Sequence, residues 1–510
     1  MHKPKNTLQG ARIVVSGIDL EQSVHRGIAN YSKSLINALN GAGAKIWILT
    51  EFDPTLPPDI CKALPKDSKE LIYCGRVLQQ LAADTANNQI AMNIEANDKL
   101  QATKKWTEAA KKIFKQISRQ LNVKSNYTKS DIHIIDIRKY DRNPYFYHKR
   151  LSYISHIDGL LCAKNIYRNS MLAAKYKNST VQIDLDEFDG FITTCPLNIK
   201  AKNTKFTLQT IHDIIPLEYP PMNENPIIFA NRLRECEKTR KIFVSVATKK
   251  KFQTHISTLP NGKDLVIIQP PSLIFSQKIM PTRNFIEIHN AIGSNKETEI
   301  LIPYRYILFN STLEPRKNVE FAIRAYQAST LPGRGIKFCI AGELMKSSYS
   351  FNIQSMVIKD KNIILTDYID DDLRKKLFLN ATALISPSLV EGFGIPVLDA
   401  ACLGLIAIVS NLDSHHEIQN LYDFKKFVWT SEIDHASKMA NLMNLAAKKL
   451  AMPKTVKSIH RSSSNRLLRL LHIKQIQSEE AMRIRRYEYY QKLMQGEFQE
   501  KLASTIRICD

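Results

Sequence analysis

The sequence predicts an α/β protein with two domains, each built on a mainly parallel sheet. Short apolar runs alternate with segments of helical period along most of the chain, and this alternation is typical of βαβ units. It comes in two series, separated by a proline-marked stretch without pattern at about 281–289. The 510 residues are enough for two or three domains, each with its own core. We therefore expect the ligand site in a cleft between two domains, beyond the carboxyl ends of the strands.

The first series opens with a strand, a helix and a second strand. The apolar run 13–15 predicts the first strand, and apolar residues at helical spacing within 31–39 predict the helix. Gly41 and Gly43 follow as stop signals, and the run 46–49 predicts the next strand. Further strands of this domain are expected at 132–137, 190–193, 206–211, 241–246 and 265–268.

The second series begins with the apolar run 306–309. The runs that follow it, each leading into a helical pattern, are 337–341, 363–365, 383–385 and 406–409. We place the first domain at 1–285, with an insertion at about 55–180, and the second domain at 286–450. The remaining residues, 451–510, are expected to form a basic linker and a solvated, charged helix, with contact to a membrane or to the acceptor as the alternative.

The charge balance predicts an anionic partner. There are 72 Lys and Arg residues against 49 Asp and Glu residues, a formal net charge of +23. Such a charge fits nucleic acid, an acidic membrane leaflet or a phosphorylated substrate. Residues 101–123 have a basic amphipathic pattern, which fits an anionic membrane surface and equally well an ordinary surface helix. We expect no nucleic-acid partner, since the sequence shows no motif for one.

The location expected from the sequence is the cytoplasm. No stretch approaches the ~18 consecutive apolar residues of a membrane span, and the first ten residues are too polar for a signal peptide. If 101–123 binds lipid, the protein would be peripheral on the inner face of the cytoplasmic membrane. The eight cysteines have no metal-ligand spacing, so reduced thiols are expected.

The most informative stretch is SPSLVEGFGIPVLDA at 386–400, directly after a predicted strand. It turns at Gly392 and Gly394 and enters a helix with Pro396 in its first turn. The N-terminus of that helix offers backbone N–H groups to an anion, and Glu391 offers a carboxylate to hydroxyl groups. This combination suits a ligand that carries both a phosphate and a sugar.

A second stretch, FNSTLEPRKNV at 309–319, also follows a predicted strand. Its adjacent Arg316 and Lys317 supply fixed positive charge for a diphosphate. Both stretches lie at strand ends of the same domain. The residues alone therefore predict an anionic ligand in an α/β cleft.

Together the two stretches resemble the GT-B-fold glycosyltransferases of family GT4, the glycosyl transferases group 1. The family patterns G-T/S-x-x-x-R-K-N and E-G-F-G-[IL]-P-x-x-E end here at Asn318 and Asp399, and the resemblance covers about 290–420. It implies two Rossmann-like domains facing each other across a deep cleft. The first would hold the acceptor and the second the nucleotide-sugar donor. It also implies sugar transfer from a nucleotide-diphosphate donor with retention of anomeric configuration.

Two shorter matches lie in the first domain. His212, in TIHDIIP at 210–216, looks like the family's His-Asp loop, which implies that this histidine contacts the donor sugar. Gly27, in RGIANY at 26–31, is similar to the family's glycine loop beside the donor phosphate, although Ala29 replaces a frequent second glycine. A histidine after a strand is, without such a context, more often structural.

The resemblance implies catalytic roles for His212, Arg316, Lys317 and Glu391. The two cations would neutralise the diphosphate as the glycosidic bond breaks, Glu391 would orient the donor sugar, and no protein nucleophile is implied. The residues implied in donor binding are Gly27, Thr312, Arg316, Lys317, Gly392, Phe393, Gly394, Ile395, Val397, Leu398 and Asp399, the last for the ribose.

Two acidic clusters receive structural interpretations. Asp184 and Asp186 match a D-x-D metal motif only superficially, and neither a metal nor another cofactor is expected. The acidic run 370–372 is expected to cap and begin a helix.

The expected partners are a nucleotide-sugar donor, with a mild preference for mannose, and a saccharide or lipid-linked acceptor. Cell-surface polysaccharide or lipopolysaccharide synthesis is the process expected. The alternative is a catalytically silent GT-B module that binds or acts as a scaffold. It is motivated by three departures from the family pattern: Asp399 replaces a Glu, Ser311 replaces a frequent basic residue, and Asn310 replaces a glycine.

Overall fold

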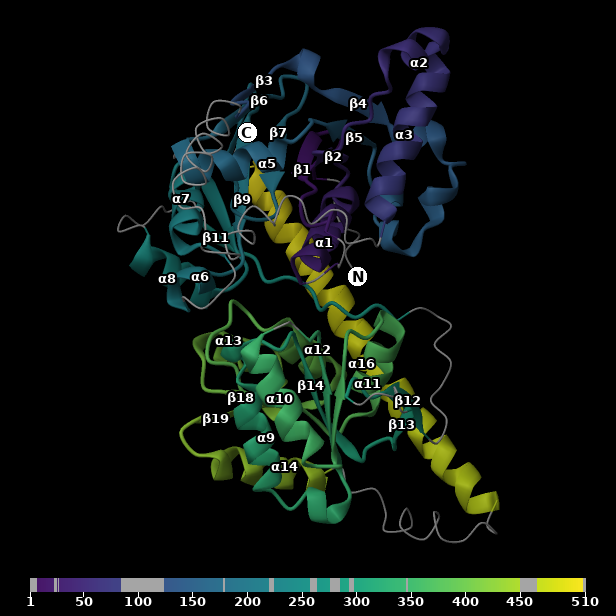
Figure 1. Cartoon of the computed structure of the whole chain (residues 1–510), viewed down its shortest axis with the longest axis vertical. Helices are drawn as coiled ribbons and strands as arrows, with labels where there is room; N and C mark the ends of the chain where they lie inside the picture. The colour runs from purple at the N-terminus through teal and green to yellow at the C-terminus, as the bar shows by residue number, and fades with distance from the viewer. Residues whose placement is uncertain are drawn as a thin grey trace, which may run out of the picture. The chain divides into compact units, whose positions relative to one another are not determined.

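The computed structural model has the predicted α/β architecture, in two units that each contain their own sheets (Figure 1). One unit comprises Met1–Pro270 with Gln495–Asp510, and the other comprises Pro271–Met494. The division thus falls earlier in the chain than the predicted 285, and the end of the chain belongs to the first unit. The residues that the structure describes are 7–22, 25, 27–83, 123–177, 179–219, 224–256, 264–275, 285–292, 298–344, 347–449 and 466–507.

The first unit is built on an eight-stranded sheet with the order β11-β10-β9-β7-β1-β2-β5-β4. Its pairs are parallel, except that β4 runs antiparallel to β5 at the edge. The strands are β1 Arg12–Ser16, β2 Lys45–Thr50, β4 His133–Asp136, β5 Gly159–Cys162, β7 Gly190–Thr193, β9 Phe206–Ile211, β10 Arg240–Phe243 and β11 Leu265–Val266. The predicted strands are present, and β5 was missed.

Helices and a small sheet complete the first unit. Helix α1, Gly27–Gly41, buries Tyr31, Leu35 and Leu39 on one face, as their spacing predicts. The other helices are α2 Pro58–Ala63, α3 Lys66–Ala82, α5 Ile166–Leu172, α6 Ile215–Glu218, α7 Pro226–Glu237 and α8 Val246–His255. The small sheet has the order β3-β6-β8, with β3 Asn126–Tyr127, β6 Val181–Asp184 and β8 Ile199–Lys202. The predicted basic helix at 101–123 lies, except for Val123, outside the described residues.

Several short turns are helical. The 3₁₀ turns are Lys129–Asp131, Ile137–Tyr140, Pro144–Tyr147, Lys149–Leu151, Ile154–His156, Pro315–Lys317, Pro332–Arg334 and Phe424–Lys426, and one π turn spans Ala173–Lys177.

The second unit is built on a six-stranded parallel sheet with the order β16-β15-β14-β17-β18-β19. The strands are β14 Tyr306–Asn310, β15 Lys337–Ala341, β16 Ile363–Thr366, β17 Ala383–Ser386, β18 Ile406–Ser410 and β19 Val428–Ser431. Strand β12 Ile286–His289 lies in the stretch at about 281–289 in which the sequence showed no pattern, and it pairs antiparallel with β13 Thr298–Leu301.

Six helices flank this sheet: α9 Val319–Gln327, α10 Ser348–Ile358, α11 Asp371–Asn380, α12 Ile395–Leu403, α13 Asp413–Gln419 and α14 Ala436–Lys449. The predicted cap of α11 is confirmed, because the Asp370 carboxylate accepts a hydrogen bond of 2.7 Å from the Leu373 amide. The core is formed by the sheet together with α9, α10 and α14 and includes Phe309, Ile340 and Met443.

The strand order of the second unit places its two motifs side by side. The order reverses between β14 and β17, which are neighbouring parallel strands. Chain connections therefore leave in opposite directions at this point, and in open α/β sheets ligands bind beside the loops at such a point. The loop after β14 carries Arg316 and Lys317, and the loop after β17 carries Glu391.

The last helix, α16, Arg466–Arg507, contradicts the prediction of a solvated tail. Arg483 is 3% exposed, and its Nη1 donates to the carbonyls of Leu379 and Ala381 at 2.9 and 3.1 Å. In the first unit Phe498 is buried, and its ring meets Tyr31 with centroids 5.8 Å apart. Charged residues on the exposed positions hid this apolar stripe from the sequence analysis. None of the described helices is long and apolar enough to span a membrane.

We predict that Phe498→Ala destabilises the first unit by about 3–5 kcal/mol, since it removes a buried ring. Glu500→Ala changes an exposed position of the same helix and serves as the control, with an expected change within about 0.5 kcal/mol. Chemical denaturation followed by circular dichroism measures both values. Equal stability of the two variants would show that α16 does not contribute to this unit.

Candidate functional site

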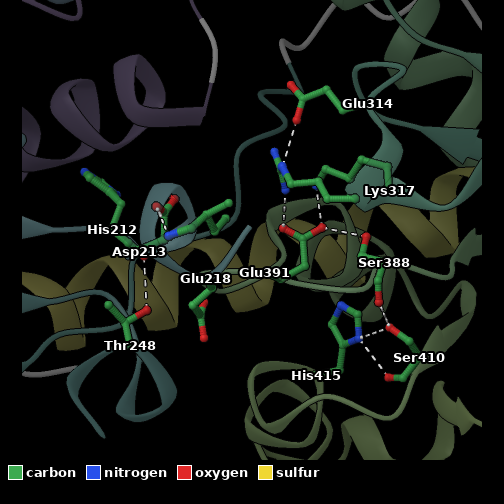
Figure 2. Close-up of polar contacts among 12 residues, drawn as sticks. His212, Asp213, Glu218, Thr248, Glu314, Lys317, Ser388, Glu391, Ser410 and His415 are labelled. Atoms are coloured by element: carbon green, nitrogen blue, oxygen red, sulfur yellow. Dashed lines mark hydrogen bonds and ion pairs between the residues drawn. The ribbon is translucent and has the colours of Figure 1, made fainter. Parts of the chain in front are cut away.

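The centre of the candidate site is the buried carboxylate of Glu391 in the second unit (Figure 2). Lys317 Nζ contacts its Oε1, and Arg316 Nη1 lies 3.5 Å from its Oε2. Ser388 Oγ donates a hydrogen bond of 2.8 Å to Oε1. The Arg316 Nε atom, in turn, is 2.7 Å from Oε2 of Glu314. The structure thus brings together Arg316, Lys317 and Glu391, three of the predicted catalytic residues.

These side chains are positioned by the loops after β14 and β17. The Leu389 amide donates to the Arg316 carbonyl at 2.7 Å, which joins the two loops through their backbones. Asn318 adopts a left-handed conformation, φ 55°, between the 3₁₀ turn Pro315–Lys317 and α9. The loop after β14 lies so close to Gly342 that only glycine fits there, since a Cβ atom would lie 1.8 Å from the Ser311 carbonyl oxygen.

The electrostatic balance keeps Glu391 ionised. Burial alone would raise the pKa of this carboxyl, but the charges of Lys317 and Arg316 outweigh that effect and lower its pKa to about 2. The side chains of Lys317 and Glu391 are each only 10% exposed, so solvent screens their attraction weakly. Arg316 Nη1 is buried and, among the described residues, has no hydrogen-bond partner. It can therefore donate to a ligand.

The turn Gly392–Gly394 leads into α12 and leaves its N-terminus open. Gly394 has φ +104°, which strongly favours glycine, and no side chain caps the helix. Phe393 is buried and Ile395 is half-buried at this end of the helix. The Ile395 amide and the positive end of the helix dipole are thus oriented for an anion or a hydroxyl group.

Other residues implied in donor binding lie differently. Thr312 is half-buried in the loop after β14, and its carbonyl accepts from the Glu314 amide at 3.0 Å. Val397 and Leu398 are fully buried, and their amides donate to the Gly394 carbonyl. The side chains of Val397 and Leu398 are apolar, and their amides already form hydrogen bonds within α12. Neither residue therefore offers a hydrogen-bonding N–H group to the nucleotide-sugar donor.

The structure does not leave Asp399 free for the ribose, the role that the family resemblance implies. Its carboxylate is fully buried and accepts from the Ser272 amide and hydroxyl at 2.7 and 2.6 Å. Tyr487 of α16 donates to it at 2.7 Å, and Arg374 at 3.0 Å. Both oxygens are occupied by protein donors, so this carboxylate is not available to ribose hydroxyls in the structure.

Sequence reasoning had Ser388 only as part of the motif 386–400, without a role, and missed Ser410 and His415. Ser388 donates to Glu391, Ser410 Oγ donates to the Ser388 carbonyl at 2.5 Å, and His415 Nδ1 lies 2.9 Å from the Ser410 carbonyl. Ser410 ends β18, which pairs with β17. The rule that ligand sites lie at strand ends could have pointed to the loop after β18 as well.

The predicted residues of the first unit follow β9 and begin α1. His212 Nε2 lies 2.8 Å from the Thr194 carbonyl, so Nε2 carries the proton and a neutral ring offers Nδ1 as an acceptor. Burial lowers the pKa of His212, and this outweighs the opposing effects of the Thr194 carbonyl and of Asp19. A Cβ atom at Gly27 would meet no atom within 4 Å, so space beside this backbone is open.

Asp184 and Asp186 serve structural contacts. Asp184 Oδ1 accepts from Asn203 at 2.8 Å, and Asp186 pairs with Lys129. Among the described residues, no group of acidic, histidine or cysteine side chains has the arrangement of a metal site.

We predict that Glu391→Gln destabilises the second unit by about 3–5 kcal/mol at pH 7, since it leaves the buried Lys317 without its counter-charge. The low pKa of Glu391 stabilises the fold above the usual carboxyl pKa, and this contribution is lost as the pH falls through about 2. The stability difference between wild type and variant should therefore shrink between pH 4.5 and pH 2. Urea titrations at several pH values measure it, and a difference independent of pH would contradict the ionised pair.

We predict that Asp399→Ala also costs about 3–5 kcal/mol, because the half-buried Arg374 loses its carboxylate partner and the buried Tyr487 hydroxyl loses its acceptor. Tyr487→Phe removes one donor and should cost about 1.5–3 kcal/mol. Tyr489→Phe, at a position 62% exposed, is the control. Denaturation midpoints rank the three variants, and a stable Asp399→Ala protein would show that the carboxylate is not a structural anchor.

Comparison with known proteins identifies the region around this site. Residues 294–452 match the family model for glycosyl transferases group 1. The serotype-specific mannosyltransferase WbdA of Escherichia coli is 25% identical over 247 residues, which cover 45% of this chain and 28% of WbdA. The O-antigen chain mannosyltransferase RfbU of Salmonella typhimurium is 28% identical over 213 residues, covering 41% of this chain and 53% of RfbU. The chain thus spans under a third of WbdA and about half of RfbU.

Among solved structures, sucrose-phosphate synthase from Thermosynechococcus elongatus aligns with 95% of this chain and 99% of its own, at 12% identity and a TM-score of 0.45. The family match covers the sheet of the second unit and both loops that meet at Glu391. The part of this chain that carries the Glu391 cluster, residues 294–452, thus matches the glycosyl transferases group 1 family.

Proposed function

We propose that the chain is a glycosyltransferase that moves a sugar from a nucleotide-diphosphate donor to a saccharide or lipid-linked acceptor. The observation that carries the proposal is the cluster of Arg316, Lys317 and Glu391 at the point where the strand order reverses. It combines two cations with a carboxylate and an uncapped helix N-terminus. A diphosphate linked to a polyhydroxyl group matches this combination.

The proposed mechanism depends on electrostatic stabilisation of the leaving group. Without ligand, the charge of Glu391 holds both cations in place; with donor bound, the diphosphate oxygens share them. As the bond between the anomeric carbon and the phosphate oxygen breaks, negative charge grows on that oxygen, and Arg316 and Lys317 stabilise it. The acceptor hydroxyl attacks the same face and passes its proton to the departing phosphate, which gives retention. The reaction needs no metal, since the chain supplies the cations.

Mannose is the preferred donor sugar in this proposal. WbdA and RfbU are described as mannosyltransferases, and RfbU as one that acts on an O-antigen chain. We therefore propose GDP-mannose as the first donor to test and cell-surface polysaccharide or lipopolysaccharide synthesis as the process. A cytoplasmic location, with 101–123 contacting the inner membrane face, stays a prediction.

A catalytically silent binding module is the second candidate. It is favoured by Asp399, which is saturated by protein donors and offers nothing to ribose. Nucleotide binding without sugar transfer would support it over the transferase.

We predict that one nucleoside diphosphate among GDP, UDP and ADP raises the apparent melting temperature of the protein, as a ligand of the native state must. Lys317→Met removes the charge with little change in volume and should weaken that binding at least tenfold. Lys425→Met, at an exposed position of the same unit, should leave it unchanged. Transfer from the matching sugar nucleotide, with the product anomer assigned by NMR, then tests retention. Absence of binding by all nucleotides would overturn the proposal.

A further inference from the structure

His415 is a fully buried residue with one unpaired ring nitrogen. Its Nδ1 lies 2.9 Å from the Ser410 carbonyl oxygen, and because a carbonyl only accepts, Nδ1 carries the proton. Nε2 has no hydrogen-bond partner among the described residues. A buried polar atom without a hydrogen-bond partner lowers the free energy of unfolding by about 1–3 kcal/mol. The unpaired Nε2 of His415 therefore requires an explanation.

The ring is neutral in this environment. Burial lowers the pKa of His415 and outweighs the opposing effects of the Ser410 carbonyl and the Glu391 carboxylate, while Lys317 lowers the pKa further. A neutral ring with its proton on Nδ1 presents Nε2 as a lone-pair acceptor. Its natural partner is therefore an O–H or N–H donor.

The unpaired nitrogen lies on the side of Glu391. Figure 2 shows it on the edge of the ring turned away from Ser410 and toward the Glu391 carboxylate. A Cβ atom at Gly394 would lie 3.4 Å from Nε2 and 3.3 Å from Cδ2 of His415, so the ring edge abuts the turn before α12. A second buried polar atom without a hydrogen bond, Nη1 of Arg316, forms an ion pair with Oε2 of Glu391 at 3.5 Å. A donor and an acceptor that each lack a hydrogen bond thus accompany the same carboxylate.

Phosphate is a poor partner for Nε2. The oxygens of an ionised diphosphate have no hydrogen to donate and would repel the lone pair. A sugar hydroxyl can donate to Nε2 and, through its oxygen, accept from a cation nearby.

We propose that His415 Nε2 accepts a hydrogen bond from a hydroxyl group of the transferred sugar and so helps to select that sugar. The inference rests on the proposed function and adds to it a recognition residue outside both motifs. The sugar binds between Glu391 and the turn Gly392–Gly394, which shifts to admit it. The two glycines of the turn make such a shift inexpensive.

Two substitutions separate recognition from structure. In His415→Asn the amide nitrogen can replace Nδ1 and keep the bond to the Ser410 carbonyl, while Nε2 is lost. In His415→Gln the longer side chain can replace Nε2, while the bond to Ser410 is lost. His416→Asn, at the neighbouring half-buried residue, is the matched control. Calorimetry measures the affinities of GDP and GDP-mannose, and of UDP and UDP-glucose, together with thermal midpoints.

We expect His415→Asn to bind the sugar nucleotide about tenfold more weakly than wild type, with the affinity for the free nucleoside diphosphate and the thermal midpoint unchanged. His415→Gln should lose less than threefold in sugar-nucleotide affinity. With deoxy-sugar donors, wild type should lose about tenfold at one hydroxyl position, and His415→Asn should lose nothing further there.

Equal weakening of nucleotide and sugar nucleotide in His415→Asn, or no weakening of either, would overturn the inference while leaving the proposed function intact. A wild-type protein that binds none of the four compounds overturns the proposed function and this inference together.

Discussion

The second unit depends on one buried carboxylate held between two cations. Without Lys317 and Arg316, burial would drive Glu391 to its protonated form; with them, its pKa falls to about 2. The pairing fixes the loops after two neighbouring strands against each other, and the backbone bond from Leu389 to Arg316 reinforces it. A buried ion pair is costly to desolvate and adds little net stability compared with an apolar cluster. The presence of this ion pair is therefore better explained by the proposed function, in which Arg316 and Lys317 bind the ligand, than by stability.

Much of the fold was predictable because apolar runs in parallel sheets are nearly continuous. Strands β7, β9 and β15 coincide with the predicted runs. The pair β12 and β13 escaped prediction because only alternate residues, such as Ile286 and Ile288, are buried. Helix α16 was misjudged for a related reason. Its buried residues, among them Tyr487, are scattered among charges, and only the packed structure shows which face is covered.

The site was predictable where the motif residues act at strand ends and not where they enter the helix. Glu391 lies in a turn, so the eight positions to Asp399 are not helical spacing throughout, and the direction of that side chain could not be deduced. An aspartate is also one methylene shorter than the family's glutamate, and its partners, Ser272 and Tyr487, are remote in sequence. His415 carries no motif of its own; only its unpaired nitrogen draws attention to it.

The first unit is assembled from both ends of the chain, with the whole second unit between them. During synthesis the sheet residues up to Pro270 leave the ribosome first, followed by every strand of the second unit, and only then Phe498 and its neighbours. The second unit can fold before synthesis of the first unit is complete. The first unit cannot, because Phe498, which packs against Tyr31 of α1, is synthesised last. Joining so distant segments carries a loop-closure cost and slows folding. The first unit is therefore the last part of the described chain that can complete its core during synthesis.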